Sequence, residues 1–550
     1  MRLMWNIIPE LQHSRHLQSL FYIQKRCSSV EQFSVIRMPV ETAKQLERLK
    51  FKKKRAERVQ LVQNSRKGDC TVPVISCKRK VYNHYLGQSY NKFAEVPLAS
   101  KGWKHLKAVG DYFTINSHAK NPSVEGSDED HLCFESLGLK KDLLTEIYKL
   151  DFEKPTNIQA LAIPHVLEGK NTFITAETGN GKTLAFLAPM LQQIAKLKLS
   201  VGSELPFNSP LGLVIVPSRE LAEQIFDVAR RLGDNLGINV QVLVGGRTKK
   251  KMLHPELAQQ DLLIATVGAL SKLTTVRVWN TDYLRHVAMD EADTLLDDSF
   301  SEKVLHFISK LPVQGANEET QQPEILSGVQ LTLVAATMPR NLHTILHPLV
   351  NLESLVHLTT PHVNRFMPHV PQRFIRVNRN TKTDQLMKLV SRDVKRNIPI
   401  VIFCNDSKTS DWISLFLNEN NISCINLNGA MKAVLRKGRF EAFQAGKAAV
   451  LSCTDIASRG LDTIKAGHVI NYNFPSYIAD YIHRCGRIGR VGSKVPGVVT
   501  NLVHFPKEVE LVQRIEYAVR KNEPFHNVNA NITRIITNKI EKKLEAKMSG

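Results

Sequence analysis

The chain has 550 residues, more than one hydrophobic core usually serves, so two or more globular domains are expected. Its 43% hydrophobic and 23% charged residues exclude wholesale disorder or a fibre. A formal charge of +22 favours a polyanionic partner, either nucleic acid or an anionic membrane face. Residues 1–125 hold 23 Lys and Arg against 9 Asp and Glu, a surplus of 14, whereas the rest of the chain carries a surplus of only 8.

Two features that the sequence lacks narrow the class of protein further. No apolar run approaches the roughly 20 residues that a membrane-spanning helix needs, so no membrane insertion is expected. The eight cysteines are scattered without a CxxC pair, which favours a reducing compartment over a disulfide framework and offers no zinc-finger spacing.

Residues 1–30 are basic, contain serines and have a single acid, Glu10. This composition predicts a mitochondrial transit peptide and a matrix location. The alternative is a flexible basic tail that lies on RNA, because Pro9 weakens any helix that begins at Met1.

Residues 31–125 form a basic N-terminal extension. Within it, residues 39–64 have a helical pattern, and the cations of LKFKKKRAER at 49–58 surround every face of that helix. The pattern favours a solvated arm that contacts phosphates, although such a cluster also resembles a nuclear or nucleolar address. The polar residues 117–130 predict the linker into the first folded domain.

After that linker, short apolar strands alternate with helical stretches, which predicts an α/β fold with two doubly wound parallel sheets. We expect one domain at 126–355, a link at 356–370, a second domain at 371–525 and a tail at 526–550. The expected strands are 172–175, 212–216, 239–244, 261–266, 286–289 and 331–336 in the first half, and 398–403, 422–427, 448–453, 468–472 and 497–503 in the second.

The sequence AETGNGKT at 176–183 joins the first strand to an apolar helical stretch and matches a P-loop, although Ala176 replaces the first glycine of that pattern. Its glycines allow backbone N–H groups to turn toward phosphate. Lys182 offers a point charge to the phosphates, and Thr183 offers a hydroxyl to Mg²⁺. Together these residues predict a nucleotide site.

Two further clusters carry charges that phosphoryl transfer uses. Asp290 and Glu291 follow a strand, where adjacent carboxylates can serve Mg²⁺ and an attacking water. The second half contains HRCGRIGR at 483–490, whose three arginines, Arg484, Arg487 and Arg490, are expected to project along one side as planar cations.

The order and spacing of these motifs over roughly residues 130–520 resemble the DEAD-box ATP-dependent RNA helicases. The resemblance implies two tandem RecA-like domains, ATP and Mg²⁺ as cofactors, and RNA as partner. Thr156 to Gln159 resemble the motif that reads adenine, with Gln159 on the edge of the base. Phe134, 17 residues upstream, would stack on its ring, and a core aromatic is the alternative for this residue.

The same resemblance assigns the other roles. Lys182 and Thr183 would hold phosphates and metal, Asp290 would bind the metal through water, and Glu291 would activate the hydrolytic water. Arg487 and Arg490 resemble arginine fingers. The remaining residues implied by family motifs are Thr178, Gly179, Gly181 and Asp462 for the nucleotide, His483 for catalysis, and Ser218, Arg219, Gly245, Gly246, Thr266 and Thr454 for the RNA backbone.

Three departures from the family pattern bear on function. Ala335 stands where the family has a serine whose hydroxyl is linked to coupling between hydrolysis and unwinding, Ala269 replaces an arginine, and Ala433 replaces a glutamine three residues before the retained Arg436. We expect an RNA-stimulated ATPase with a monomeric core. It would remodel structured or double-stranded ribosomal RNA, with ribosomal or assembly proteins as partners, during assembly of the mitochondrial large ribosomal subunit. The alternative is an ATP-gated RNA clamp that hydrolyses slowly and unwinds poorly.

Overall fold

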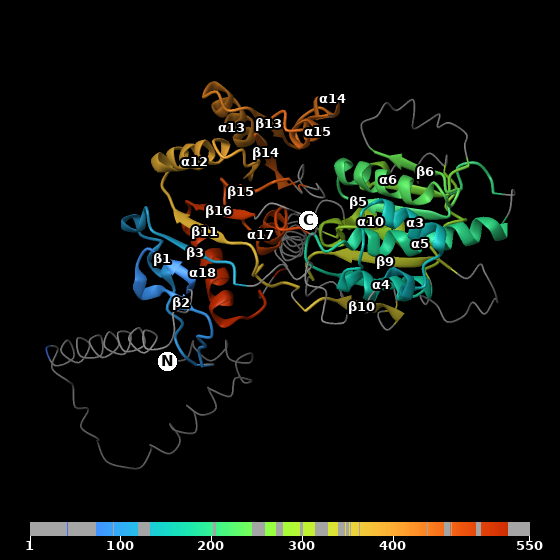
Figure 1. Ribbon diagram of the computed structural model, residues 1–550, viewed down its shortest axis with the longest axis horizontal. Coiled ribbons are helices and arrows are strands. Elements are labelled where there is room, and N and C mark those ends of the chain that lie inside the picture. Colours follow the sequence, from blue (N-terminus) through green and yellow to red (C-terminus); the bar gives the residue numbers. More distant parts are fainter. Residues whose placement is uncertain are drawn as a thin grey trace, which may run out of the picture. The chain divides into compact units, whose positions relative to one another are not determined.

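Figure 1 shows the computed structural model of the chain. It describes residues 41, 73–91, 93–118, 133–201, 205–244, 259–270, 279–296, 301–313, 328–338, 347, 351, 354–361, 363–436, 438–455, 463, 465–490, 497–525 and 528. The predicted transit peptide and nearly all of the predicted arm and tail lie outside these ranges. No helix in the described part of the chain is long and apolar enough to cross a membrane.

The first sheet has seven parallel strands in the order β10-β4-β9-β8-β5-β7-β6. Alternate residues of its strands pack into different cores: Ile174 packs with the helices α3, α4, α5 and α6, and Phe173 with α9 and α10. Both faces are therefore covered, as the continuous apolar strands predicted. The strands are β4 (Thr172–Thr175), β5 (Gly212–Val216), β6 (Val240–Leu243), β7 (Leu262–Thr266), β8 (His286–Met289), β9 (Gln330–Ala335) and β10 (Val356–Thr359), and the helices are α3 (Lys141–Lys149), α4 (Asn157–Leu167), α5 (Lys182–Val201), α6 (Arg219–Gly233), α9 (Ala292–Leu295) and α10 (Ser301–Ile308).

Strand β10 differs from the sequence expectation. It lies at the start of the segment 356–370, where we expected only a link, and pairs in parallel with β4 at the edge of the first sheet. The local sequence VHLT is short and its exposure alternates, so it lacks the continuous apolar run by which the other strands were predicted.

The second sheet has nine strands in the order β13-β14-β12-β15-β16-β11-β3-β1-β2. The six from β13 to β11 run parallel, and β3 continues the sheet antiparallel to β11. These six strands are β11 (Gln372–Arg376), β12 (Ile400–Cys404), β13 (Cys424–Leu427), β14 (Val450–Thr454), β15 (His468–Asn471) and β16 (Val498–Val503), and the helices are α12 (Arg379–Val394), α13 (Ser407–Glu419), α14 (Ala433–Arg436), α15 (Arg439–Gln444), α17 (Ile478–Cys485) and α18 (Pro506–Lys521).

The three remaining strands come from the basic N-terminal extension, which we expected to lie outside the folded domains. They are β1 (Pro73–Cys77), β2 (His84–Tyr85) and β3 (Tyr112–Ile115), and Figure 1 shows them in blue beside β11 and α18. Phe113 stacks on Phe374 of β11 with ring centroids 4.7 Å apart. The extension is therefore partly a structural piece of the second domain, and we call residues 73–118 the strand extension.

A buried ion pair fastens the strand extension to α18. Glu516 and Arg520 have side chains with no exposed surface, and their Oε1 and Nη2 atoms lie 2.7 Å apart. Glu516 also accepts hydrogen bonds from the backbone N–H of Ala99 at 2.7 Å and from the hydroxyl of Ser100 at 2.6 Å. Arg520 donates to the carbonyl of Tyr82 at 2.7 Å. The extension therefore supplies hydrogen-bond partners to both members of a buried ion pair, and its loss would leave these charged groups with fewer partners.

Candidate active site

The predicted P-loop lies between β4 and α5, at the carboxyl end of the first sheet. Gly179 and Gly181 have φ of +88° and +73°, a backbone conformation that other residues rarely adopt. Lys182 donates from Nζ to the carbonyls of Ala176 and Glu177, each at 2.8 Å. Burial lowers the pKa of the Lys182 ammonium to about 8, although the carboxylate of Asp290 opposes the shift. The negative charge of bound phosphates would offset the cost of burying this ammonium.

Gln159, in α4, is hydrogen-bonded to the P-loop. Its Nε2 donates to the carbonyl of Gly181 at 3.0 Å, and its Oε1 accepts from the backbone N–H of Thr156 at 2.9 Å. Thr156 caps α4 and its hydroxyl donates to the carbonyl of Asn180 at 2.9 Å. A primary amide has two N–H donors and two oxygen lone pairs, so these two hydrogen bonds use one of each.

The acidic pair follows β8. Burial, followed by the charge of Glu291, raises the pKa of Asp290 to about 7. Glu291 has φ of +53°, a left-handed conformation that is uncommon for a residue with a side chain and that clusters at functional sites. Its Oε2 atom is buried and has no hydrogen-bond partner among the residues that the structure describes. This carboxylate is therefore available to a water or ligand.

His483 and Thr337 hold the third acid of this segment. Asp293 Oδ2 accepts from the backbone N–H of Thr337 at 2.9 Å and from its hydroxyl at 2.7 Å. His483 Nε2 lies 3.1 Å from the same oxygen. Burial would raise the pKa of Asp293, but His483 and Thr337 outweigh it and hold that pKa well below its usual value. His483, predicted as catalytic, thus links the two domains through Asp293.

Arginines of the second domain complete the cluster. Arg487 Nη2 lies 3.6 Å from Glu291 Oε1, and its side chain is only 3% exposed. Arg490 lies against the P-loop, since a Cβ built on Gly179 would be 2.8 Å from Arg490 Cγ. A Cβ on Gly486 would fall 1.5 Å from Thr178 Oγ1, so only glycine fits there.

The expectation that all three arginines project together is wrong for Arg484. Its guanidinium turns into the second domain, where it binds Asp455 in bidentate fashion with both distances 2.6 Å, and it donates to Asn405 at 2.8 Å. Residue spacing alone does not reveal this, because Asp455 comes from another part of the chain, directly after β14 (Val450–Thr454).

Phe134 also does not lie where a stacking role requires. The ring is fully buried and packs edge-on against Tyr148 with centroids 6.3 Å apart, which favours the core interpretation. Two aromatics between Phe134 and Thr156 have exposed surface: Tyr148 is 39% exposed and Phe152 is 38% exposed.

The residues predicted to contact RNA follow strand ends in both sheets. Ser218 caps α6 after β5, Thr266 ends β7, and Thr454 ends β14. Arg219 begins α6. The predicted residues Gly245, Gly246 and Asp462 lie outside the described residues.

One pair near these strand ends was not predicted. Arg436 Nη2 lies 2.7 Å from Glu220 Oε1, and both side chains are mostly buried. The pair joins α14 of the second domain to α6 of the first, as Arg487 and Glu291 do beside the P-loop. Among the described residues, Arg436–Glu220 therefore adds to the contacts between the domains that Arg487–Glu291 and His483–Asp293 make.

The residues present fit a nucleotide with Mg²⁺. Within the described ranges, no group of three or more His, Cys, Asp or Glu side chains is arranged to hold a metal. Mg²⁺ in nucleotide sites usually keeps several waters and binds substrate phosphates besides one or two protein oxygens. The Thr183 hydroxyl and the Asp290 carboxylate are hard oxygen donors of the required kind. The buried, unpartnered Oε1 of Glu177 and Oε2 of Glu291 mark polar space around the loop.

A P-loop and an acidic pair on one α/β domain, completed by arginines from a second, define a two-domain NTPase. Comparison with known proteins agrees: residues 156–345 match the DEAD/DEAH box helicase model, and residues 381–492 match the helicase conserved C-terminal domain. The chain belongs to the DEAD-box ATP-dependent RNA helicases.

The relatives cover nearly the whole chain. It is 37% identical over 473 residues to "Probable ATP-dependent RNA helicase DDX28" of Mus musculus, covering 84% of this chain and 86% of the mouse protein. It is 36% identical over 512 residues to the Homo sapiens protein of the same name, covering 91% and 93%.

Solved structures agree on the fold. Saccharomyces cerevisiae Dbp5 bound to RNA and ADP BeF3 is 25% identical, with a TM-score of 0.59, and the match covers 71% of this chain and 94% of Dbp5. Mss116 bound to ssRNA and UDP-BeF is 22% identical with a TM-score of 0.61, over 70% and 77%. Both sheets are therefore RecA-like domains, as expected.

Proposed function

We propose that this ATP-dependent helicase binds structured RNA across its two domains and couples ATP hydrolysis to local strand separation. The observation that carries the proposal is the approach of Arg487 to Glu291 at 3.6 Å, because it joins the arginine of one domain to the catalytic acid of the other. A site assembled from two domains forms only when they close, so ligands that favour closure are coupled.

Each residue of the cluster has a role in this proposal. The P-loop amides and Lys182 bind the phosphates, and Thr183 and Asp290 hold Mg²⁺, which neutralises phosphate charge when bound. Glu291 orients and deprotonates the attacking water through its unpartnered Oε2. Arg487 and Arg490 stabilise the charge that develops on the transferred phosphoryl group.

RNA would bind along the carboxyl ends of both sheets. Ser218, Thr266 and Thr454 place hydroxyls or backbone groups there, which suits contacts to phosphates and 2′-hydroxyls. Support for RNA as the partner comes from the family and from Dbp5, whose similar structure is bound to RNA. Contacts of this kind carry little sequence information, so discrimination among sequences would be weak.

Ribosomal RNA of the mitochondrial large subunit is our proposed substrate. It rests on the basic, acid-poor residues 1–30 and on the charge surplus of residues 1–125. Import of a reporter fused to residues 1–30, followed by crosslinking of the full chain to RNA in cells and sequencing of the bound fragments, tests location and substrate. A nuclear reporter or fragments free of ribosomal RNA would contradict this assignment.

A second candidate is an ATP-gated RNA clamp, favoured by Ala335. This residue is 1% exposed at the end of β9, and its side chain lacks the hydroxyl that the family has at this position. A clamp would bind RNA in an ATP-dependent way yet separate few strands per ATP hydrolysed.

The test of the proposal measures ATP turnover by the full chain with and without RNA, then unwinding of a short duplex. We expect RNA to stimulate turnover and ATP to drive unwinding. Turnover that ignores RNA would contradict the helicase function, whereas stimulated turnover without unwinding would favour the clamp.

A further inference from the structure

The strand extension prolongs the carboxyl edge of the second sheet. Strand β3 is antiparallel to both β11 and β1, so β1 runs in the same direction as β11 and ends at the same edge. The residues after β1, Lys78 to Lys80, and those before β3 therefore lie at the edge where β11 and β16 end. Thr454 ends β14 at this same edge.

Arg376, at the end of β11, holds this edge together. Its Nε donates to the carbonyl of Trp103 at 2.7 Å, and its Nη1 donates to the carbonyls of Val503, at 3.0 Å, and His504. Its own carbonyl accepts from the N–H of Gly110 at 2.8 Å. Arg376 is 4% exposed and therefore anchors residues 103–111 beside the end of β16.

The surface around this anchor is rich in cations. Its exposed cations are Lys78, Arg79, Lys80, Lys104, Lys107, Arg379 and Lys507, and its acids are Asp111, Glu508 and Glu510. We call these seven cations the basic edge. The side chains of Lys78, Arg79 and Lys104 are 49%, 62% and 49% exposed, so phosphates can reach them. Lys78 and Arg79 share the mostly buried Asp111, whereas both partners of the Lys104–Glu510 pair are exposed and such a pair is weak.

An aromatic side chain lies among these cations. Phe505, which directly follows His504, is 54% exposed although it is a large apolar residue. Proteins that bind single-stranded nucleic acid combine cations, which contact the phosphates of the nucleic-acid backbone, with exposed aromatic rings. The bases can stack on these rings because every base has a flat aromatic face. Charge and ring chemistry thus point to the same class of ligand.

We propose that the basic edge binds single-stranded RNA that extends beyond the helicase core. This inference rests on the proposed function, since the RNA reaches the edge from the site that includes Thr454. Four strand spacings separate β14 from β11 and two more reach β1, about 20 to 30 Å along the sheet. At about 3.4 Å per nucleotide, roughly six stacked nucleotides reach β11 and roughly nine reach β1.

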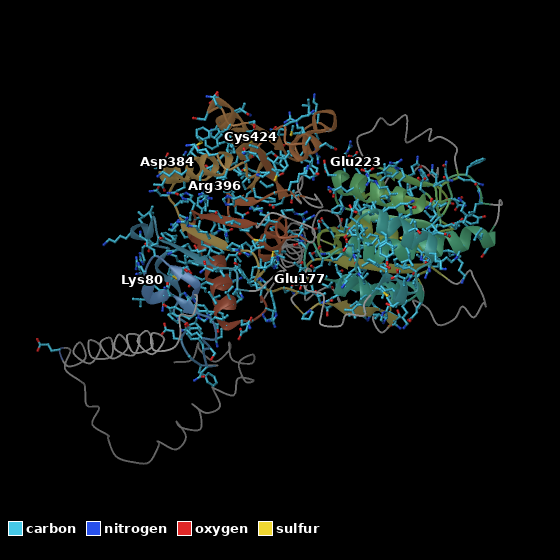
Figure 2. All side chains as sticks on the ribbon, viewed as in Figure 1. Lys80, Glu177, Glu223, Asp384, Arg396 and Cys424 are labelled. Atoms are coloured by element: carbon cyan, nitrogen blue, oxygen red, sulfur yellow. The ribbon has the colours of Figure 1, made fainter. Side chains whose placement is uncertain are left out.

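The test compares two triple variants of the full chain. The edge variant carries Lys80→Gln, Lys107→Gln and Lys507→Gln, three exposed cations of the basic edge. The control variant carries Lys395→Gln, Arg396→Gln and Lys447→Gln, which remove the same charge before β12 and β14 at the opposite edge of the same sheet. Figure 2 labels Lys80 and Arg396.

Binding of unstructured RNAs of 10 and 30 nucleotides is measured over a range of salt. For the edge variant we expect about tenfold weaker binding of the longer RNA, a salt slope smaller by about two, and a 10-nucleotide affinity like that of the natural chain. The control variant should bind both RNAs normally.

Unchanged binding of the longer RNA by the edge variant, or an equal loss in the control variant, would overturn the proposal. Failure of the proposed function would show differently, as ATP turnover by the natural chain that the 10-nucleotide RNA does not stimulate.

Discussion

The chain builds the two sheets in different ways. The first sheet comes from one continuous stretch, from β4 to β10, whereas the second joins strands from before and after that stretch, with β3 and β11 more than two hundred residues apart. The first domain is thus inserted within the second. We therefore expect the N-terminal strands to contribute to the stability of the second domain. The stability of the P-loop domain should not depend on them.

The largest effect should come from breaking the buried ion pair. Glu516→Gln leaves Arg520 charged in a site without exposed surface, which costs about 3 to 5 kcal/mol of unfolding free energy. Hydrogen exchange of β3 and β11 in urea should accelerate while that of β4 and β9 does not. Glu510→Gln on the same helix removes an exposed pair with Lys104 and should cost at most about 1 kcal/mol. Equal losses in both variants would contradict the role given to the buried Glu516–Arg520 pair.

The next effect tests how closely the domains approach. Gly486→Ala places a Cβ 1.5 Å from Thr178 Oγ1, so the arginines can no longer settle beside the P-loop. We expect kcat for ATP to fall about 100-fold, as small misplacements of catalytic groups do. Gly102→Ala, where a Cβ meets nothing within 4 Å, serves as control. Normal turnover by the Gly486 variant would show that this contact is not used.

The stability of the first sheet is expected to depend on pH, which gives a test specific to that sheet. Burial lowers the pKa of His286, in β8, to about 4, against about 6.5 unfolded. The unfolded chain therefore binds more protons between these values, and stability falls as pH drops through 6.5 toward 4. From pH 7.5 to 5 this residue should cost roughly 2 kcal/mol. Urea unfolding should show that the stability of His286→Gln falls by about 2 kcal/mol less over this pH range than that of the natural chain. The same pH dependence of stability in both chains would show that His286 is not the group responsible.

The smallest effect concerns Ala335. Ala335→Ser restores a hydroxyl at the end of β9, and we expect stability to change by about 1 kcal/mol or less. Strand separation per ATP hydrolysed should rise a few-fold while RNA-stimulated turnover stays constant. An unchanged ratio of unwinding to hydrolysis would remove the argument for a clamp.

Much of this structure could be predicted from the sequence. Strands β4, β5 and β8 begin and end where their apolar runs do. Asp290 and Glu291 were predicted as site residues because they follow such a strand, and Lys182 because it ends the glycine-rich loop that joins such a strand to a helix. The strand extension was missed because PVISC and YFTI are short and their partner β11 is remote in sequence.

Side-chain directions were harder to predict than strand positions. Arg484 has the same spacing as Arg487 and Arg490, yet Asp455 draws it into the second domain. Phe134 matches a motif position, yet its ring fills the core of the first domain. In both cases the deciding neighbour comes from another element of the tertiary structure, which local sequence does not encode.

The most direct test of an active site assembled from both domains is the rate of ATP turnover by Glu291→Gln in the presence of RNA. The amide keeps the shape of the side chain but cannot take a proton from water. We predict retained ATP and RNA binding with turnover reduced by at least about 100-fold. Turnover close to that of the natural chain would show that Glu291 is not the general base and that its approach to Arg487 does not assemble the active site.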